Sequence, residues 1–370
     1  MYASRLVEAL SRRDPDLRFY GCAGPRMQAA GVAPLVDAAS IAVIGVAEVL
    51  AHIPRIFRQY RKLARSIASD PPDVAILTDS PGFHMRLLPH LKRAGVPVIY
   101  FVAPQSWAWR KDRLPRMRSG IDQLLCIFPF EPEFFLRHGI KATYVGHPLS
   151  RIVRATAPVA TLRAKFRIPM GAPLIALLPG SRPAEVLRHL PDLLDAVDRI
   201  QASHPAHFIL ALPRGFAVRA SLAKYEERFS RASIQICEGE TWDILACSDV
   251  ALAASGTVTI EAAFLGTPMV TFYRVTKLSW ILGKLLVRIP FYCMVNLVAG
   301  RRVVPELLQD EMTGANLAAQ ALSLLDDAAV NLEMRRGLAE VAQKLSSADD
   351  PIEVAASVVG KYLKEEIIHV

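Results

Sequence analysis

Two short loops in the second half of the chain carry residue types that can bind a phosphate group. The first follows the apolar run 174–178 and contains Gly180, Ser181 and Arg182, with Pro183 directly behind them. Proline favours the first turn of a helix, and the free N–H groups at a helix start attract anionic oxygen, which a neighbouring guanidinium can grip in bidentate fashion. A tight turn with a surface arginine explains the same residues equally well, because glycine and serine are common in turns.

The second loop follows the apolar run 250–253. Ser255, Gly256 and Thr257 occupy it, and Glu261 lies one helical turn beyond Thr257. Glycine lets a ligand approach the backbone closely, and a carboxylate at Glu261 can accept hydrogen bonds from both ribose hydroxyls while loop amides hold the phosphates. Ser255 or Thr257 can instead serve only as a helix N-cap. Two such loops at adjacent strand ends favour a nucleotide-binding site.

A third candidate lies in the first half, where Asp79 follows the apolar run 73–78 and precedes Ser-Pro-Gly. A carboxylate facing a cleft between domains can deprotonate an acceptor hydroxyl, which makes Asp79 a candidate general base. Asp-Ser-Pro-Gly is also an ordinary turn sequence, so turn chemistry alone accounts for these residues. His84 is a weaker candidate that can simply cap or pack.

Aromatic and basic residues follow the next apolar run, 96–102. Trp107 and Trp109 precede Arg110, so the segment can stack on a sugar and bind a phosphate. Packing at a domain edge with a solvated basic flank fits the same residues, and the sequence leaves both interpretations open.

Two segments combine apolar and basic residues at helical spacing, 46–65 and 277–292. Helices of this composition lie in anionic lipid surfaces. Core helices with snorkelling basic residues, or a dimer interface, are the alternatives. In the first segment, the apolar residues expected to contact the acceptor or the membrane are Val46, Val49, Leu50 and Ile53.

The composition limits the classes of protein that fit. The chain has 370 residues, 52% of them hydrophobic, so two folded domains are expected. The net charge of +9 predicts an anionic partner, and the absence of an aromatic-interleaved basic motif favours phosphates and membranes over nucleic acid. No apolar stretch reaches the roughly 18 to 20 residues of a membrane span. The first residues lack the apolar core of a signal peptide, so the protein is expected in the cytoplasm. Five scattered cysteines predict neither disulfides nor a zinc site.

Short apolar runs alternate with helical segments, which predicts doubly wound parallel sheets with ligands at the carboxyl ends of strands. A helix is expected over 85–94, with Gly95 as its C-cap, and another from Pro351 to about residue 366. The boundaries predict three parts: a first Rossmann-like domain over 1–150, a second over 151–345 and a C-terminal helix in 346–370. The predicted strands are 73–78, 96–102, 123–128, 142–145, 174–178, 208–212, 234–236, 250–253 and 268–272.

Taken together, these segments resemble the lipid-A-disaccharide synthases over nearly the whole chain. No single match is specific, but their order and spacing are. The matching stretches are Gly24-Pro-Arg-Met27, Ile44-Gly-Val-Ala-Glu-Val-Leu50, Asp79-Ser-Pro, Pro104-Gln-Ser-Trp-Ala-Trp-Arg110, Phe128-Pro-Phe-Glu131, Val145-Gly-His-Pro148, Leu178-Pro-Gly-Ser-Arg182, Ala184-Glu-Val186, Ala254-Ser-Gly-Thr257 with Glu261, Asn296-Leu-Val-Ala-Gly300 and Glu306-Leu-Leu308.

The resemblance implies a GT-B fold, in which two Rossmann-like domains face a cleft and the C-terminal helix packs back on the first. It implies an inverting hexosyltransferase that joins UDP-2,3-diacylglucosamine to 2,3-diacylglucosamine 1-phosphate (lipid X). The products would be the β-1,6 disaccharide of lipid A and UDP, formed without metal or cofactor. The enzyme would sit peripherally on the cytoplasmic face of the inner membrane.

The resemblance also assigns residues. Asp79 would be the base or an acceptor-site carboxylate, Arg182 would hold the UDP phosphates, and Ser255 to Thr257 would line them. Glu261 would take the ribose, and Asn296 would reach the nucleotide site, in some members from a partner chain through a domain-swapped homodimer.

One departure from the family pattern concerns the start of the chain. Family members begin with a strand and a Gly-Glu-x-Ser-Gly-Asp loop, and this sequence starts immediately after that position. Met1 is therefore expected to be an internal residue of a longer chain; a truncated, inactive form is the alternative.

Two other functions fit the same motifs. One is a related GT-B activity on a different UDP-N-acetylglucosamine-type substrate, such as a lipid-linked transferase or an epimerase. The other is a catalytically inactive protein that binds the membrane surface.

Overall fold

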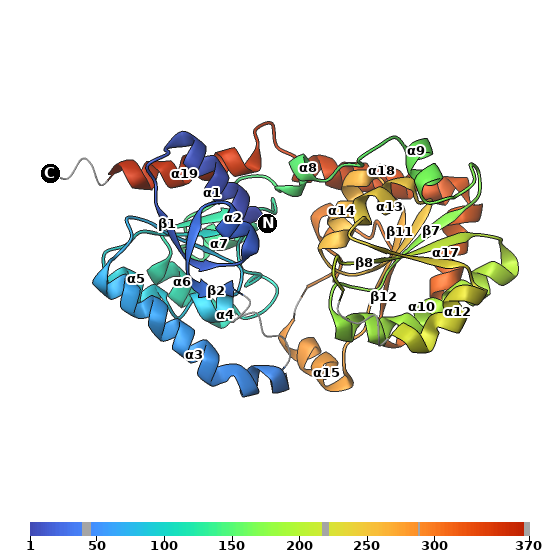
Figure 1. Cartoon of the computed structure of the whole chain (residues 1–370), viewed down its shortest axis with the longest axis horizontal. Coiled ribbons are helices and arrows are strands. Elements are labelled where there is room, and N and C mark those ends of the chain that lie inside the picture. Colours follow the sequence, from blue (N-terminus) through green and yellow to red (C-terminus); the bar gives the residue numbers. More distant parts are fainter. Residues whose placement is uncertain (39–45, 217–221, 288, 366–370) are drawn as a thin grey trace. The chain divides into compact units, whose positions relative to one another are not determined.

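The computed structural model describes residues 1–38, 46–216, 222–287 and 289–365, and these form two compact units (Figure 1). The N-terminal unit contains residues 1–148 together with the chain from Ser347 onwards, and the C-terminal unit spans Leu149–Ser346. The last helix of the chain therefore belongs to the unit formed by the first residues.

The C-terminal unit alternates strands and helices, as the apolar runs predicted. The strands Leu174–Leu178 and Val250–Ala254 are buried and apolar throughout, because both faces of a parallel sheet are covered by helices. Its elements are α8 (Leu149–Ile152), α9 (Val159–Lys165), β7 (Leu174–Leu178), α10 (Pro183–Ser203), β8 (His207–Leu212), a 3₁₀ turn (Ala223–Tyr225), α12 (Glu226–Arg231), β9 (Ile234–Glu238), α13 (Thr241–Cys247), β10 (Val250–Ala254), α14 (Thr257–Leu265), β11 (Met269–Tyr273), α15 (Lys277–Leu286), α16 (Met294–Ala299), β12 (Glu306–Leu308), a 3₁₀ turn (Gln309–Glu311), α17 (Gly314–Asp326) and α18 (Ala328–Leu345).

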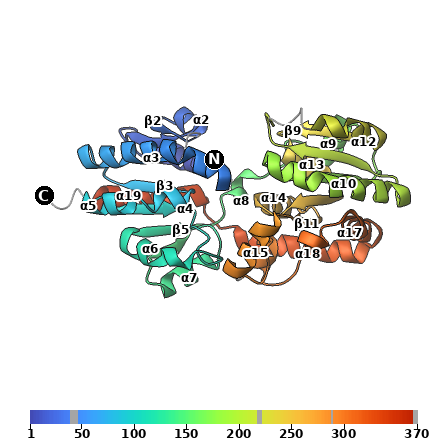
Figure 2. The same cartoon turned by 90° about the horizontal axis from the view of Figure 1, so that it is seen from below.

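All six strands of this unit are parallel and lie in the order β12-β11-β10-β7-β8-β9. The chain therefore runs outward from β7 to β9, returns to the other side of β7 and runs outward again to β12. This is the Rossmann order, and its direction reverses between β7 and β10. At such a reversal the connections leave on opposite faces of the sheet, which opens a crevice at the carboxyl ends of the two strands. Helices α14 and α18 lie side by side on this unit (Figure 2).

The N-terminal unit holds two parallel sheets, β3-β4-β5-β6 and the pair β1-β2. Its elements are α1 (Tyr2–Arg13), β1 (Phe19–Ala23), α2 (Pro25–Ala29), β2 (Val32–Asp37), α3 (Val46–Ser69), β3 (Ala75–Thr78), α4 (Pro81–His84), α5 (Leu88–Arg93), β4 (Val98–Phe101), a 3₁₀ turn (Lys111–Arg113), α6 (Leu114–Gly120), β5 (Gln123–Cys126), α7 (Glu131–Arg137), β6 (Ala142–Tyr144) and α19 (Pro351–Glu365).

The predicted C-terminal helix is confirmed as α19, and it packs against α1 in the N-terminal unit (Figure 1). Glu353 accepts from Arg12 at 2.7 Å and from Arg13 at 2.9 Å, which fixes the register of the two helices at the surface. Exposed ion pairs contribute little to stability, so buried apolar residues such as Ala355 and Val359 supply most of the attachment.

The structure corrects three local predictions. The helix expected over 85–94 is shorter than predicted: α5 begins only at Leu88, because Pro89 favours the first turn of a helix, and the separate short helix α4 ends before residue 85. Gly95 does take the left-handed conformation expected after a helix end. The start of the second predicted domain, for which no helix was predicted, contains α8 and α9. Strands β1 and β2 escaped prediction because Gly21 and Pro34 interrupt their apolar patterns.

None of the helices described combines the length and apolar character needed to cross a lipid bilayer.

Two helical glycines test how tightly the helices pack. A Cβ on Gly337 in α18 would lie 2.6 Å from Cγ1 of Val303, whereas a Cβ on Gly360 in α19 meets nothing within 4 Å. We expect Gly337→Ala to destabilise the protein by about 1–3 kcal/mol, because a stiff β-branched side chain must move. Gly360→Ala should stabilise it by about 0.5–1 kcal/mol through helix propensity. Urea unfolding midpoints measure both; equal shifts of the same sign would contradict the packing.

Candidate active site

The structure brings the two predicted phosphate loops together at the β7–β10 reversal. The last paired residues of these strands, Leu178 and Ala253, are neighbours across the ladder, and each strand then runs into a loop and a helix. Gly180 has φ +124°, and a Cβ there would lie 2.9 Å from a carboxylate oxygen of Glu185. Only glycine fits this position, because it tolerates the backbone angle and leaves space for the Glu185 side chain.

Arg182 stands at the start of α10, as predicted, and its side chain is about half exposed. Its guanidinium lies 2.9 Å from Oε1 of Glu185, and the same oxygen accepts from the Tyr273 hydroxyl at 3.1 Å. Tyr273 ends β11, so a residue two strands away from β7 orients Glu185 and, through it, Arg182. Ser181 is exposed in the same loop.

The β10 loop differs in one detail from the predicted N-cap. Gly256 occupies the cap position of α14, and neither Ser255 nor Thr257 caps the helix with its side chain. The Ser255 hydroxyl donates to the carbonyl of Tyr292 at 3.2 Å, and Thr259 donates to the carbonyl of Gly256 at 2.8 Å. The N–H of Thr259 donates to the Gly256 carbonyl at 3.1 Å, and no side chain caps the start of α14, so the N–H groups before Thr259 can face an anion.

Glu261 lies on α14 one turn beyond this loop and is half-buried. Burial raises the pKa of its carboxyl, and a hydrogen bond from Trp242 opposes that increase. Trp242 did not emerge from the sequence analysis, because a lone tryptophan near a strand end has no distinguishing pattern.

A buried histidine holds the first phosphate loop in place. His189, on the apolar face of α10, has Nδ1 2.7 Å from the carbonyl of Pro179, and its Nε2 accepts from the backbone N–H of Arg274 at 3.1 Å. Burial lowers the pKa of His189, in agreement with a neutral ring that donates at one nitrogen and accepts at the other. His189 thereby ties the end of β7 to the end of β11.

Arg274 extends this connection to β12. Its guanidinium pairs with Asp192 and donates to the carbonyls of Gln309, at 3.2 Å, and Met312. The side chain of Gln309 accepts from the N–H of Val275 at 2.6 Å in return. Sequence reasoning missed these residues; the only available signal was a histidine on an otherwise apolar helix face.

The resemblance implied that Asn296 reaches the nucleotide site, and the structure shows which groups its side chain binds. It is fully buried, and its amide donates to the carbonyl of Val304 at 2.9 Å and to Oε1 of Glu306 at 2.7 Å. Its oxygen accepts from the N–H groups of Val303, at 2.7 Å, and Val304, at 3.0 Å. These bonds use both amide hydrogens and the carbonyl oxygen, so Asn296 positions the α16–β12 segment within its own unit.

Asp79 is exposed and lies directly after β3 in the N-terminal unit. It has φ +56° and is followed by Ser80 at φ +37°, two left-handed non-glycine residues in succession. Such residues cost roughly 1–2 kcal/mol each and persist where the surroundings hold them. The hydroxyl of buried Tyr100 donates to the Asp79 carbonyl at 2.6 Å, and Nδ1 of His84 lies 2.8 Å from it. His84 thus acts as a hydrogen-bonding and packing residue, and burial lowers its pKa.

The tryptophan segment contains a buried carboxyl partner. Trp107 donates to Oε1 of Glu131 at 3.0 Å, and the other oxygen accepts from the N–H of Phe128 at 3.1 Å. Glu131 is only 1% exposed, and burial raises its pKa to about 8. Trp107 is thus held by a hydrogen bond to buried Glu131, whereas Trp109 and Arg110 are exposed, the latter paired with Asp112 at 2.9 Å.

The two amphipathic segments form helices α3 and α15. The side chains of Val46, Val49 and Leu50 lie outside the described residues, and Ile53 is exposed. On α15, Ile281 is 58% exposed. These helices present apolar and basic side chains at their surfaces.

Known proteins similar to this chain show which family it belongs to. The family model described as lipid-A-disaccharide synthetase matches residues 1–353. The lipid-A-disaccharide synthase of Solibacter usitatus (strain Ellin6076) is 51% identical over 370 residues, covering 100% of this chain and 96% of that protein. The chain belongs to the lipid-A-disaccharide synthase family. The resemblance seen in the sequence is therefore confirmed.

Solved structures of low sequence identity to this chain share its fold. The UDP-GlcNAc 2-epimerase of Neisseria meningitidis bound to UDP-GlcNAc matches with a TM-score of 0.61 and 12% identity, covering 98% of this chain and 96% of that one. A calicheamicin glycosyltransferase matches with a TM-score of 0.58 and 16% identity, covering 98% and 94%. The predicted GT-B fold is thus confirmed.

Glu131 makes a pH-dependent contribution to the free energy of unfolding, and this contribution can be measured. Because the folded pKa of about 8 exceeds the ordinary value of 4.5, folded protein retains a proton that unfolded protein releases between those pH values. The stabilisation is fully present below about pH 4.5 and is lost as the pH rises to about 8. We expect the unfolding free energy of the native protein, relative to Glu131→Gln, to fall across this range. Urea titrations at several pH values measure the difference, and a constant difference would contradict the assignment.

Proposed function

We propose that this chain is the inverting glycosyltransferase that condenses UDP-2,3-diacylglucosamine with 2,3-diacylglucosamine 1-phosphate. The acceptor 6-hydroxyl attacks the anomeric carbon of the donor, the bond from that carbon to the diphosphate breaks, and UDP leaves with its electron pair. The β-1,6 disaccharide 1-phosphate remains. The observation that carries this proposal is the pair of glycine-containing loops at the β7–β10 reversal, in a chain that matches its family over nearly its full length.

The C-terminal unit would bind the UDP part of the donor. N–H groups at the starts of α10 and α14 point to one edge of the sheet, where they can hold the two phosphates. Arg182 adds a guanidinium that already has an anionic partner in Glu185, which a diphosphate can replace or share. As the diphosphate departs its negative charge increases, so these fixed dipoles and the guanidinium stabilise the transition state.

Glu261 would accept hydrogen bonds from the ribose hydroxyls. Its position one turn into α14 sets it beyond the phosphate-binding amides, as a ribose requires. Asn296 and Glu306 would act indirectly: Glu306 accepts from the N–H groups of Tyr292, at 2.9 Å, and Cys293, at 3.2 Å, and so holds the segment that receives the Ser255 hydroxyl.

The N-terminal unit would supply the acceptor site. Asp79 has an exposed carboxylate on a strained turn whose backbone carbonyl is fixed by Tyr100 and His84, and the N–H of Ser80 donates to Oδ1 of that carboxylate at 2.8 Å. We assign it the role of base that takes the proton of the acceptor hydroxyl. Exposed Trp109 and Arg110 would face the lipid-bearing substrates.

Peripheral contact with an anionic membrane would use α3 and α15. Both substrates carry acyl chains, and exposed Ile53 and Ile281 lie beside basic residues on these helices. Sedimentation with anionic vesicles tests this contact.

Disaccharide formation from radiolabelled acylated substrates tests the activity. Product that requires both lipids, together with released UDP, supports the proposal. An isomerised sugar nucleotide without acceptor would instead identify an epimerase, and the absence of any product would overturn the transferase assignment.

The proposed role of Asp79 as base can be tested with a second exposed aspartate as the control. We expect Asp79→Asn to lower kcat by about 10²–10⁴, because the amide cannot accept the acceptor proton, with donor binding unchanged. Asp73, which precedes the same strand and is also exposed, provides the control, and Asp73→Asn should retain activity. Comparable loss in both variants would contradict a specific role for Asp79.

Arg182 has a matched control on the same helix. We expect Arg182→Lys to raise the donor KM about tenfold, because lysine cannot make a bidentate contact with a diphosphate. Arg199 pairs with Asp195 at 2.9 Å and is similarly exposed, so Arg199→Lys should leave the KM unchanged. An unchanged donor KM in Arg182→Lys would remove this residue from the phosphate site.

A further inference from the structure

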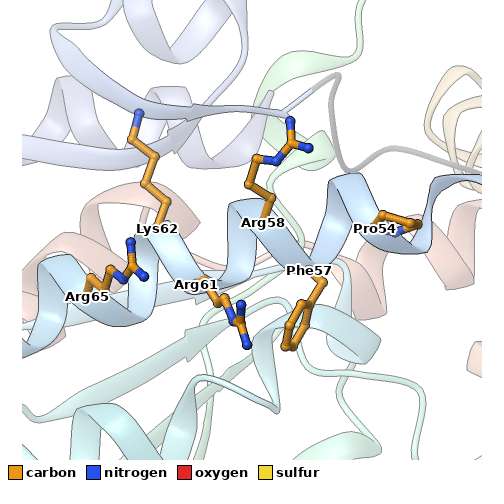
Figure 3. A pocket seen from close by; sticks show the side chains of 6 residues that line it. All are labelled: Pro54, Phe57, Arg58, Arg61, Lys62 and Arg65. Atoms are coloured by element: carbon orange, nitrogen blue, oxygen red, sulfur yellow. The ribbon is translucent and has the colours of Figure 1, made fainter.

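Helix α3 carries a groove of about 500 Å³ that lies wholly within the N-terminal unit. Figure 3 shows Arg58 and Lys62 extending to one side of the helix and Phe57 and Arg61 to the other. A volume of this size is within the range of small-molecule sites. The lining residues are Pro54, Phe57, Arg58, Arg61, Lys62 and Arg65.

The groove is strongly cationic: among the described residues that line it, four side chains are basic and none is acidic. Arg58 and Arg65 each lie three or four residues from Arg61 and Lys62, so the pairs that neighbour on the helix surface repel. In the part of the chain that the structure describes, none of the four forms an ion pair, whereas Arg12, Arg13 and Arg110 of the same unit all do. Arg58, Arg61, Lys62 and Arg65 thus make a site with unneutralised charge, which fits an anionic ligand.

The same groove has an apolar side. Phe57 is 46% exposed, and Ile53, one turn earlier, is 48% exposed. The guanidinium of Arg61 stacks over the Phe57 ring at 4.4 Å, which holds a cation beside the apolar surface. A ligand with a phosphate next to an acyl chain would complement both features.

Ring contacts connect the groove to the Asp79 turn. Phe57 stacks on Tyr60 at 6.0 Å, Tyr60 meets Phe83 edge-on at 6.4 Å, and Phe83 meets His84 at 5.6 Å. His84 in turn contacts the carbonyl of Asp79. The groove and the proposed base are therefore parts of one packed structure.

We propose that this groove captures the acylated acceptor by its phosphate monoester and so makes the enzyme selective for a phosphorylated acceptor. The inference rests on the proposed function. Bulk anionic phospholipids share the chemistry of a phosphate beside acyl chains. A phosphodiester carries a single charge, however, whereas a monoester carries about −1.5 to −2 at neutral pH and exposes three acceptor oxygens. Several forked guanidinium groups within two helical turns match the monoester better.

Equilibrium binding of the radiolabelled acceptor in neutral detergent micelles tests the proposal, because such micelles remove the charge of a lipid surface. The variants are Arg61→Gln and Arg65→Gln, and the matched control is Arg55→Gln, an exposed arginine of α3 outside the groove. We expect each groove variant to weaken acceptor binding about five- to tenfold, as for loss of one charge-assisted contact, and Arg55→Gln to leave it unchanged. Binding of a dephosphorylated acceptor should be equal in all four proteins.

Two results would overturn the proposal. Equal weakening for the phosphorylated and dephosphorylated acceptors would show that the groove does not recognise the phosphate. Unchanged acceptor binding, with weaker attachment to phosphatidylglycerol vesicles, would assign the groove to the bulk membrane surface. Disaccharide formation by the native chain is measured in parallel. Selective loss of acceptor binding without any disaccharide synthesis would refute the proposed function while leaving the phosphate groove in place.

Discussion

The direction of parallel strands is the constraint on which the rest of the C-terminal unit depends. Because β7 and β10 run the same way and lie side by side, their loops and the starts of α10 and α14 must meet at one edge of the sheet. The chain leaves these strands toward opposite sides of the sheet, so nothing in the local connections fills the crevice between them. Amide groups, a guanidinium and a carboxylate therefore converge at this edge.

Polar side chains with little exposure then fix the shape of that edge. His189 is fully buried, Arg274 and Glu306 are half-buried, and each bonds to backbone groups of another segment. A buried polar group left without a partner is costly, so these bonds hold the loops in one arrangement. A phosphate site whose donors are fixed before the ligand arrives loses less free energy on binding than a flexible one.

In the N-terminal unit, hydrogen bonds likewise hold a functional loop in one arrangement, here a strained turn. Asp79 and Ser80 adopt left-handed angles that the Tyr100 hydroxyl and the His84 ring stabilise through one carbonyl. The aromatic contacts that support His84 continue to α3, so the basic groove and the Asp79 turn share one core. A change in the packing of α3 should therefore affect both the capture of a lipid substrate and the direction of the proposed base.

Local signals in the sequence determined strands β3 to β11, the Gly180–Arg182 and Ser255–Thr257 loops, the start of α10 at Pro183 and the helix beginning at Pro351. Each of these depends on residues within a few positions of one another, where apolar runs and turn chemistry are decisive. The sequence also identified Asp79, but it could not show that its backbone is left-handed. Only the tertiary structure revealed that Asn296 is buried and that Glu131 accepts a hydrogen bond from Trp107. It also revealed that His189 and Arg274 connect three strand ends. These roles arise from partners up to 85 residues apart, and whether a polar side chain faces solvent or a buried partner is decided by packing rather than by local pattern.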